Sequence, residues 1–122
     1  LGADGARVRF EPEHLRRVLV NLLDNARKHG SKATGAIEVW TEPAGEGCAL
    51  LGVWSIGAEL PDMVRQHLFE PFFSSDSRSS GLGLYISREL CQRNAAEVSY
   101  RRLPRSGLEG NAFLVHMAAT AA

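Results

Sequence analysis

The chain has 122 residues, of which 44% are hydrophobic and 23% are charged. This length suffices for one domain with a buried core and is too short for two, and the composition is ordinary for a globular protein. Its 14 basic and 14 acidic residues cancel, so no net field favours nucleic acid or an anionic membrane as a partner. We therefore expect a single domain over residues 1–122 that contacts neither nucleic acid nor membrane.

The first residues and the cysteines indicate whether the chain is part of a longer protein and in which compartment it lies. Leu1 in place of Met indicates a piece of a longer protein, and residues 1–6 are typical of a loose lead-in. No apolar run reaches the ~20 residues that span a bilayer, and the start lacks a signal-peptide pattern. Cys48 and Cys91 lack metal-ligand spacing and are interpreted as reduced thiols of a cytosolic protein, with a disulfide left open.

In chain order, alternating charged and apolar residues over 7–10 predict a short edge strand. A helix then begins at Pro12, which has acidic neighbours at the positive end of the helix dipole, and it ends at Gly30. Two strand-like runs follow, residues 35–41 and 49–55, and the residues between them, 43–47, have the composition of a hairpin turn.

The second half of the chain alternates polar and apolar stretches. Residues 61–68 predict a short helix, whereas residues 70–80 have almost nothing to bury. A linker inside a compact domain is uncommon, so we interpret 70–80 as a mobile lid. The next helix begins at the glycines after the lid, runs to about Asn94 and is expected to bury Leu82, Ile86, Leu90 and Cys91. Strands over 97–102 and 112–117, with a turn over 104–110, complete the prediction.

These elements together predict the fold class. Several strands and two long helices fit an α/β (α+β) two-layer sandwich, in which helices cover one face of a mixed sheet. A row of polar residues in the first helix suggests where a pocket lies. Apolar residues of 15–26 recur at the three-and-four spacing of one buried face, and Asn21, Asn25 and Lys28 border that face. Asparagine contributes amide groups rather than bulk, although solvated surface asparagines have the same spacing.

A specific family resemblance rests on two blocks. Residues 21–29, Asn-Leu-Leu-Asp-Asn-Ala-Arg-Lys-His, resemble the N box of the ATP-binding domain of sensor histidine kinases. Residues 68–73, Leu-Phe-Glu-Pro-Phe-Phe, and 81–84, Gly-Leu-Gly-Leu, resemble the F box and the second glycine box. The family shares its superfamily with gyrase, the ninety-kilodalton chaperones and the mismatch-repair ATPases. The resemblance covers residues 8–117 and implies a Bergerat-type fold with a mostly antiparallel sheet, and residues 81–91 are also similar to kinases that control type IV pilus genes.

The resemblance implies a magnesium and phosphate site on the first helix. Asn25 matches the family's magnesium-binding asparagine, and an amide oxygen is a ligand that Mg²⁺ accepts. Asn21 is expected to line the phosphate side, and Lys28 and His29 match the positions that close the N box. Lys28 is suited to neutralise phosphate charge, although a lysine near a helix end also simply complements the dipole.

The second glycine box implies a phosphate cradle. Glycines let the backbone approach a phosphate, and the start of the following helix favours an anion. We therefore expect nucleotide contacts from the whole block, Gly81, Leu82, Gly83 and Leu84. Arg78 of the lid is predicted to reach the terminal phosphate. In the F box, Phe72 is predicted to belong to the nucleotide site, while Phe69 is better explained by core packing.

The first glycine box departs from the family pattern, which is Asp-x-Gly-x-Gly. Ser55 occupies the position of the aspartate that accepts a hydrogen bond from the adenine amino group, Gly57 is retained, and Glu59 replaces the last glycine. Loss of a charge-assisted hydrogen bond weakens a complex by about 1–3 kcal/mol, or roughly ten- to a hundredfold. Adenine specificity is therefore open.

The resemblance implies the catalytic domain of a two-component sensor histidine kinase. Such a domain binds Mg-ATP between the first helix and the lid and donates the γ-phosphate to a histidine on a separate dimerisation domain, mainly by positioning and charge neutralisation. It contains no catalytic base, and His14 lies on the N-box helix and is not expected to be the acceptor. The full-length protein is expected to be a homodimer that acts on a response regulator indirectly. It is either cytoplasmic or an inner-membrane sensor with this domain in the cytoplasm.

Two other interpretations stay open. In the first, the domain keeps the fold but, with an altered first glycine box, acts as a degenerate module through protein interactions. The second is an anti-sigma-factor kinase, which uses this fold alone, although the F box disfavours it. An ATPase of the gyrase or chaperone branch is disfavoured as well, because the lid is short and no transducer domain follows the last strand.

Overall fold

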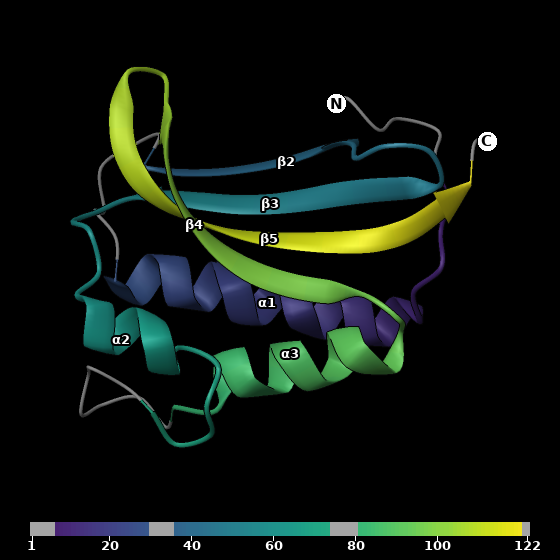
Figure 1. The fold of residues 1–122 in the computed structure, drawn as a ribbon, viewed down its shortest axis with the longest axis horizontal. Helices are drawn as coiled ribbons and strands as arrows, with labels where there is room; N and C mark the ends of the chain where they lie inside the picture. The colour runs from purple at the N-terminus through teal and green to yellow at the C-terminus, as the bar shows by residue number, and fades with distance from the viewer. Residues whose placement is uncertain (1–6, 30–35, 74–80, 121–122) are drawn as a thin grey trace.

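The computed structural model describes residues 7–29, 36–73 and 81–120, and the predicted lead-in and most of the predicted lid lie outside them. Figure 1 shows a sheet with the helices on one side of it. The elements in chain order are β1 (Arg7–Val8), α1 (Pro12–His29), β2 (Ile37–Pro43), β3 (Cys48–Ile56), α2 (Asp62–His67), α3 (Gly83–Arg93), β4 (Glu97–Arg105) and β5 (Leu108–Thr120).

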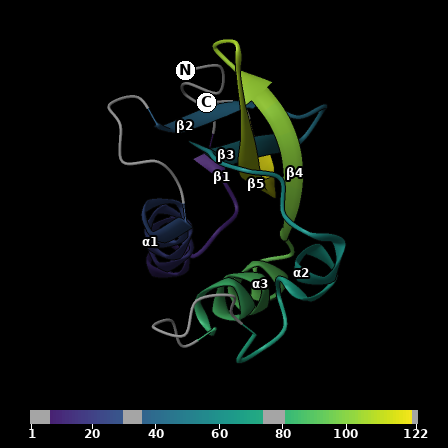
Figure 2. The same cartoon turned by 90° about the vertical axis from the view of Figure 1, so that its left-hand side faces the viewer.

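The sheet has the strand order β1-β5-β3-β2, and β4 also pairs with β5. Every pairing among the described residues is antiparallel, so the sheet is antiparallel rather than mixed. Two hairpins, β2–β3 and β4–β5, account for this arrangement because a tight turn can only join antiparallel neighbours. The turned view in Figure 2 places α1, α2 and α3 on the same side of the sheet, which confirms the predicted two-layer class.

Helix α1 forms where the sequence predicts it, with Glu11 before its first residue. The Glu11 carboxylate accepts a hydrogen bond from the His14 backbone N–H at 2.9 Å, which caps the helix start. The buried side chains of this helix, Val18, Leu22 and Ala26, recur every fourth residue and face the sheet. Its apolar face therefore forms the middle of the core.

Helix α3 packs beside α1 but in a different rotation from the predicted one. Ser87 and Cys91 are its fully buried residues, whereas Ile86 is 37% exposed. Ser87 and Cys91 lie one turn apart on the same face, and Ile86 lies about 100° away from Ser87 around the axis. The Ser87 hydroxyl is accommodated in the core because it donates a hydrogen bond to the Gly83 carbonyl at 3.0 Å.

The last two strands are longer than predicted. The expected turn over 104–110 is reduced to Ser106 and Gly107, whose φ angles of 54° and 79° match a two-residue hairpin turn. Pro104 lies within β4 and pairs with Glu109. Proline is tolerated there because its missing N–H disturbs a strand less at the edge of a sheet.

The face of the sheet away from the helices has a small core of its own. It is formed by Leu50, Trp54, Ala112 and Leu114. The fully buried Trp54 donates from Nε1 to the Leu103 carbonyl at 2.9 Å and so ties the β4–β5 hairpin to β3. Figure 1 shows this hairpin curving away from the plane of the other strands.

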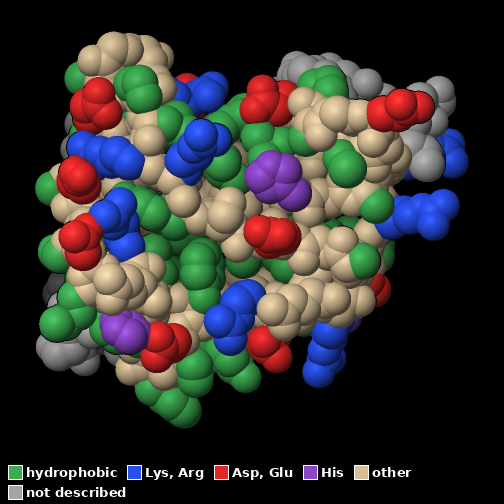
Figure 3. Space-filling model, in the orientation of Figure 1, with side chains coloured by type: hydrophobic (Ala, Val, Ile, Leu, Met, Phe, Trp, Pro, Cys, Tyr) green, Lys and Arg blue, Asp and Glu red, His purple; other side chains and the backbone are tan. Residues whose placement is uncertain are grey.

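Charged side chains do not gather by sign on the face of the molecule that Figure 3 shows. Figure 3 shows acidic and basic side chains interspersed among the residues drawn in colour, without a large area of one sign. This distribution agrees with the formal net charge of zero. None of the described helices is long and apolar enough to cross a membrane.

Candidate functional site

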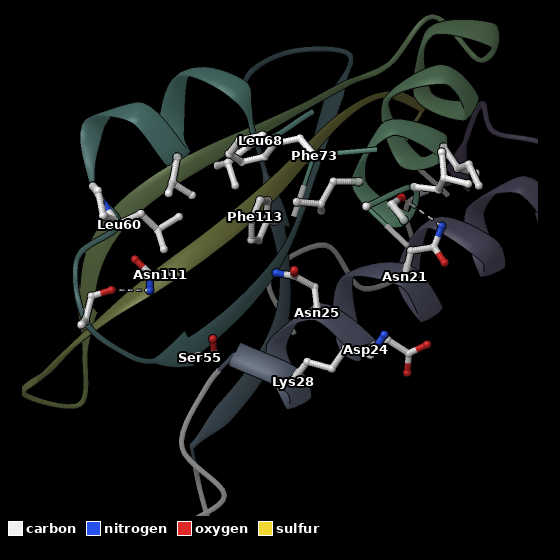
Figure 4. A pocket seen from close by; sticks show the side chains of 18 of the residues that line it. Asn21, Asp24, Asn25, Lys28, Ser55, Leu60, Leu68, Phe73, Asn111 and Phe113 are labelled. Atoms are coloured by element: carbon white, nitrogen blue, oxygen red, sulfur yellow. Dashed lines mark hydrogen bonds between the residues drawn. The ribbon is translucent and has the colours of Figure 1, made fainter. Parts of the chain in front are cut away.

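A cavity of about 590 Å³ lies between α1, the sheet and the start of α3. Figure 4 shows Asn21, Asn25 and Lys28 reaching it from α1, Ser55 from β3, and Asn111 and Phe113 from β5. The residues that line it are Asn21, Asp24, Asn25, Lys28, Ser55, Ala58, Glu59, Leu60, Pro61, Val64, Leu68, Phe73, Gly81, Leu82, Gly83, Leu84, Ile86, Asn111 and Phe113.

The α1 wall carries the polar row expected from the sequence. Asn21 donates from Nδ2 to the Gly83 carbonyl at 3.2 Å and so joins α1 to the start of α3. One turn later, the half-buried Asn25 amide makes no hydrogen bond to another described residue, and the exposed Lys28 has no ion pair among them. Asp24 also borders the cavity, but its carboxylate pairs with Arg27. The wall thus presents one neutral amide and one cation.

The opposite wall is the first turn of α3. Gly81, Leu82, Gly83 and Leu84 all line the cavity, as the second glycine box predicts by its position. Gly81 has a φ of 74°, and a Cβ on it would lie 2.6 Å from the Phe72 carbonyl carbon, so only glycine fits there. This close approach fixes the F-box backbone against the start of α3, where backbone N–H groups favour an anion.

The phenylalanine of the F box that lines the cavity is not the predicted one. Phe73 lines the cavity, whereas Phe72, the residue predicted for the site, is 77% exposed and does not. Phe72 also has a φ of 64°, which is a rare backbone conformation for a bulky residue. Phe69 packs edge-on against Phe113, with ring centroids 6.1 Å apart, in agreement with core packing.

Ser55 lies on the sheet floor of the cavity. The residue is 8% exposed, and no other described residue forms a hydrogen bond with its hydroxyl. In the antiparallel ladders, Ser55 is opposite Asn111, and Asn111 is opposite Arg102. Three polar residues of β3, β5 and β4 therefore form one row across the sheet on the side of the helices.

The segment after β3 is held against the sheet by a polar network, which we call the loop clamp and define as Tyr100, Arg102 and Asn111. Arg102 donates to the Gly57 carbonyl, and Asn111 donates from Nδ2 to the Ala58 carbonyl at 3.0 Å. The Asn111 Oδ1 accepts from Tyr100 and, at 3.2 Å, from Arg102. Gly57 itself does not line the cavity, and its role here is to accept this bond.

The charges near the loop clamp are partly balanced. Burial raises the pKa of Tyr100, so its hydroxyl stays protonated and continues to donate to Asn111. The Asp62 carboxylate, with a smaller contribution from Glu59, raises the pKa of Arg65 on α2. Glu59 is exposed at the rim of the cavity, and part of its charge therefore faces a cation rather than the interior.

Sequence reasoning missed the loop clamp. Tyr100 and Arg102 belong to the predicted strand over 97–102, and Asn111 lies just before the predicted strand over 112–117; no role was predicted for any of the three. A signal was present, because Tyr100 and Arg102 share the two-residue period of the buried Val98, and Asn111 shares that of Phe113. Polar residues at core-facing positions of a strand usually have a hydrogen-bond partner, so this pattern indicates a polar network within the fold.

Two predicted site residues cannot be placed. Arg78 and the rest of the lid from 74 to 80 lie outside the described residues. His29 ends α1, but its side chain is not described. Their proposed contacts with a nucleotide stay predictions.

Residues 10–120 match the model of the histidine kinase-, DNA gyrase B- and HSP90-like ATPase family. The chain belongs to this family. It is 38% identical to the sensor protein kinase PilS of Pseudomonas aeruginosa over 110 residues, which cover 88% of this chain and 21% of PilS. The chain thus spans about a fifth of the length of that relative.

Solved structures agree with this assignment. The mycobacterial sensor histidine kinase MprB is 26% identical, with a TM-score of 0.78 over 92% of this chain and 74% of that one. Full-length ShkA in complex with AMPPNP is 26% identical, with a TM-score of 0.71 over 89% of this chain and 22% of that one. The resemblance to the ATPase domain of two-component sensor histidine kinases is therefore confirmed.

Proposed function

We propose that this domain binds Mg-ATP in the cavity and donates the γ-phosphate to a histidine on a separate dimerisation domain in two-component signalling. The observation that carries the proposal is the pair of walls. Asn25 and Lys28 face the cavity from α1, and the glycine-rich start of α3 faces it from the other side. A cation and the start of a helix around one space suit a polyphosphate.

The residues present fit a magnesium ion bound together with the phosphates. Mg²⁺ prefers oxygen ligands and is commonly held by one or two protein groups beside substrate phosphates. Asn25 supplies such an oxygen, since its amide is half-buried at the cavity and makes no hydrogen bond to another described residue. The ion would neutralise charge on the phosphates when bound.

The chemistry assigned to this domain is positioning and electrostatic stabilisation. Phosphoryl transfer needs little covalent participation from the protein, so a domain that holds and orients the nucleotide supplies most of the catalysis. Lys28 is assigned to the phosphates and Asn21 to keeping α1 and α3 in register through Gly83. No residue of this chain is assigned as a catalytic base.

The acceptor is assigned to a different part of the full-length protein. PilS and ShkA are about five times longer than the part matched by this chain, which leaves room for a dimerisation domain. We propose a homodimer that passes the phosphate on to a response regulator. This domain would lie in the cytoplasm, whether the full-length protein is itself cytoplasmic or is anchored in the inner membrane.

Autophosphorylation of the full-length protein tests the proposal. With γ-labelled ATP, the protein should incorporate label in the presence of Mg²⁺, and Asn25→Ala should abolish or strongly reduce the incorporation. Asn94→Ala is a matched control, because it removes the same amide at the far end of α1 and α3. Equal labelling of the wild type and of Asn25→Ala would refute the assigned role of Asn25.

A second function is favoured by one departure from the family pattern. Ser55 and Glu59 replace the aspartate and the last glycine of the first glycine box. The alternative is a degenerate module that acts through protein interactions with weak or no nucleotide binding. The double variant Ser55→Asp with Glu59→Gly distinguishes the two, because gain of ATP binding only in this variant would identify a degenerate module.

A further inference from the structure

Ser55 is a buried residue whose hydroxyl makes no hydrogen bond to another described residue. The residue as a whole is 8% exposed, and it lines the cavity. Figure 4 shows its oxygen directed from the floor into the cavity. Because this oxygen faces the open cavity, its capacity to donate and to accept a hydrogen bond is available to a polar atom of a ligand.

Among the described residues that line the cavity, neither acidic side chain offers a free carboxylate at the floor. Asp24 is paired with Arg27, and Glu59 is exposed at the rim. The neighbouring Asn111 amide is engaged in the loop clamp through both its oxygen and its nitrogen. Ser55 is thus the polar side chain best placed to meet a ligand at the floor.

The remaining walls at this end are apolar. Leu60, Val64, Leu68 and Phe113 line it, and Phe113 is only 5% exposed. Such walls accommodate a flat aromatic base by packing. Apolar contacts discriminate weakly between bases that differ only in a polar substituent, so any strong selection has to come from a hydrogen bond.

On the basis of the proposed nucleotide site, we infer that Ser55 contacts the polar edge of the base and that the cavity accepts 6-oxopurine nucleotides as well as ATP. A carboxylate only accepts hydrogen bonds, so it selects the 6-amino group of adenine and repels a 6-oxo group. A serine hydroxyl both accepts and donates. It can accept from the amino group of adenine or donate to the carbonyl oxygen of hypoxanthine or guanine.

The inference is tested by calorimetric titration of this protein with ATP and with inosine triphosphate, both with Mg²⁺. Inosine triphosphate has a 6-oxo group and an N1–H where ATP has a 6-amino group and an unprotonated N1, and it carries no 2-amino group, so it changes only the polar edge assigned to Ser55. The variants are Ser55→Asp, which creates a carboxylate at the same position, and Asn25→Ala, which perturbs the opposite wall. The quantity compared is the ratio of the two dissociation constants.

We expect the wild type to bind the two nucleotides within about tenfold of each other. Ser55→Asp should raise the preference for ATP by at least about tenfold, whereas Asn25→Ala should weaken both nucleotides and leave the ratio unchanged. A wild-type preference for ATP above tenfold, or an unchanged ratio in Ser55→Asp, overturns the inference and leaves the proposed function standing. If neither nucleotide binds, the proposed function fails, and the inference fails with it.

Discussion

Replacing Asn111 by alanine removes three hydrogen bonds of the loop clamp at once. Its amide accepts from Tyr100 and Arg102 and donates to the Ala58 carbonyl. A neutral hydrogen bond contributes about 1 kcal/mol net and one to a charged group about 1.5–3 kcal/mol. Asn111 is half-buried, so water can replace part of what is lost. We therefore expect Asn111→Ala to reduce the stability of the segment by about 2 kcal/mol.

Hydrogen exchange measured by mass spectrometry detects this loss of stability in the segment itself. A loss of about 2 kcal/mol makes local opening roughly thirtyfold more frequent, so the Leu60 amide, which forms a backbone hydrogen bond to Tyr100, should exchange about thirtyfold faster. Under the proposed function, nucleotide affinity should fall as well, because Ala58 and Leu60 line the cavity. The exchange measurement needs no nucleotide and is thus independent of that proposal.

Asn94→Ala is the matched control for this prediction. Asn94 also uses its amide oxygen and nitrogen, accepting from the Glu11 backbone and donating to the Leu90 carbonyl, but it does not line the cavity. Its loss should speed exchange at the start of α1 and leave exchange of the Leu60 amide unchanged. Unaltered exchange of the Leu60 amide in Asn111→Ala would refute the role assigned to the loop clamp.

Three further predictions concern stability. Trp54→Phe should lower the free energy of unfolding in urea by about 1–3 kcal/mol, because the Leu103 carbonyl loses its donor, and an unchanged value would contradict this. Gly81→Ala should lower the melting temperature because its Cβ would overlap the F-box backbone, whereas Gly83→Ala, with nothing within 4 Å, should not. Burial raises the pKa of Cys91 from 9.0 to about 11, so the folded state keeps a proton that the unfolded state loses. The free energy of unfolding should keep the full contribution of this thiol below pH 9 and fall by at most about 3 kcal/mol as the pH rises to 11. Cys91→Ala should remove this part of the pH dependence.

The sequence predicted best what depends on local periodicity. The apolar spacing of α1 and the polar turn between β2 and β3 determine those elements almost alone, and both lie within a residue or two of their predicted ends. The same spacing placed Asn21 and Asn25 at the edge of the core, where the structure has its cavity. A helix fixes the direction of each side chain, so a row of residues can be assigned from their numbers.

Features that depend on distant parts of the chain were not predictable in this way. The loop clamp joins Arg102 to Gly57, and no local pattern indicates that these residues meet. Phe72 was assigned to the site, although it is exposed and Phe73 lines the cavity instead. The rotation of α3, which exposes Ile86, depends on how the helix packs against α1.

Calorimetric titration of this protein with ATP, in the presence of Mg²⁺ and again with the metal chelated, tests the central claim most directly. The account predicts saturable binding that requires the metal for full affinity, and Asn25→Ala should reduce the affinity with Mg²⁺ to that measured without it. Absence of heat at millimolar ATP, together with an unchanged melting temperature, would contradict the assignment of the cavity as a Mg-ATP site.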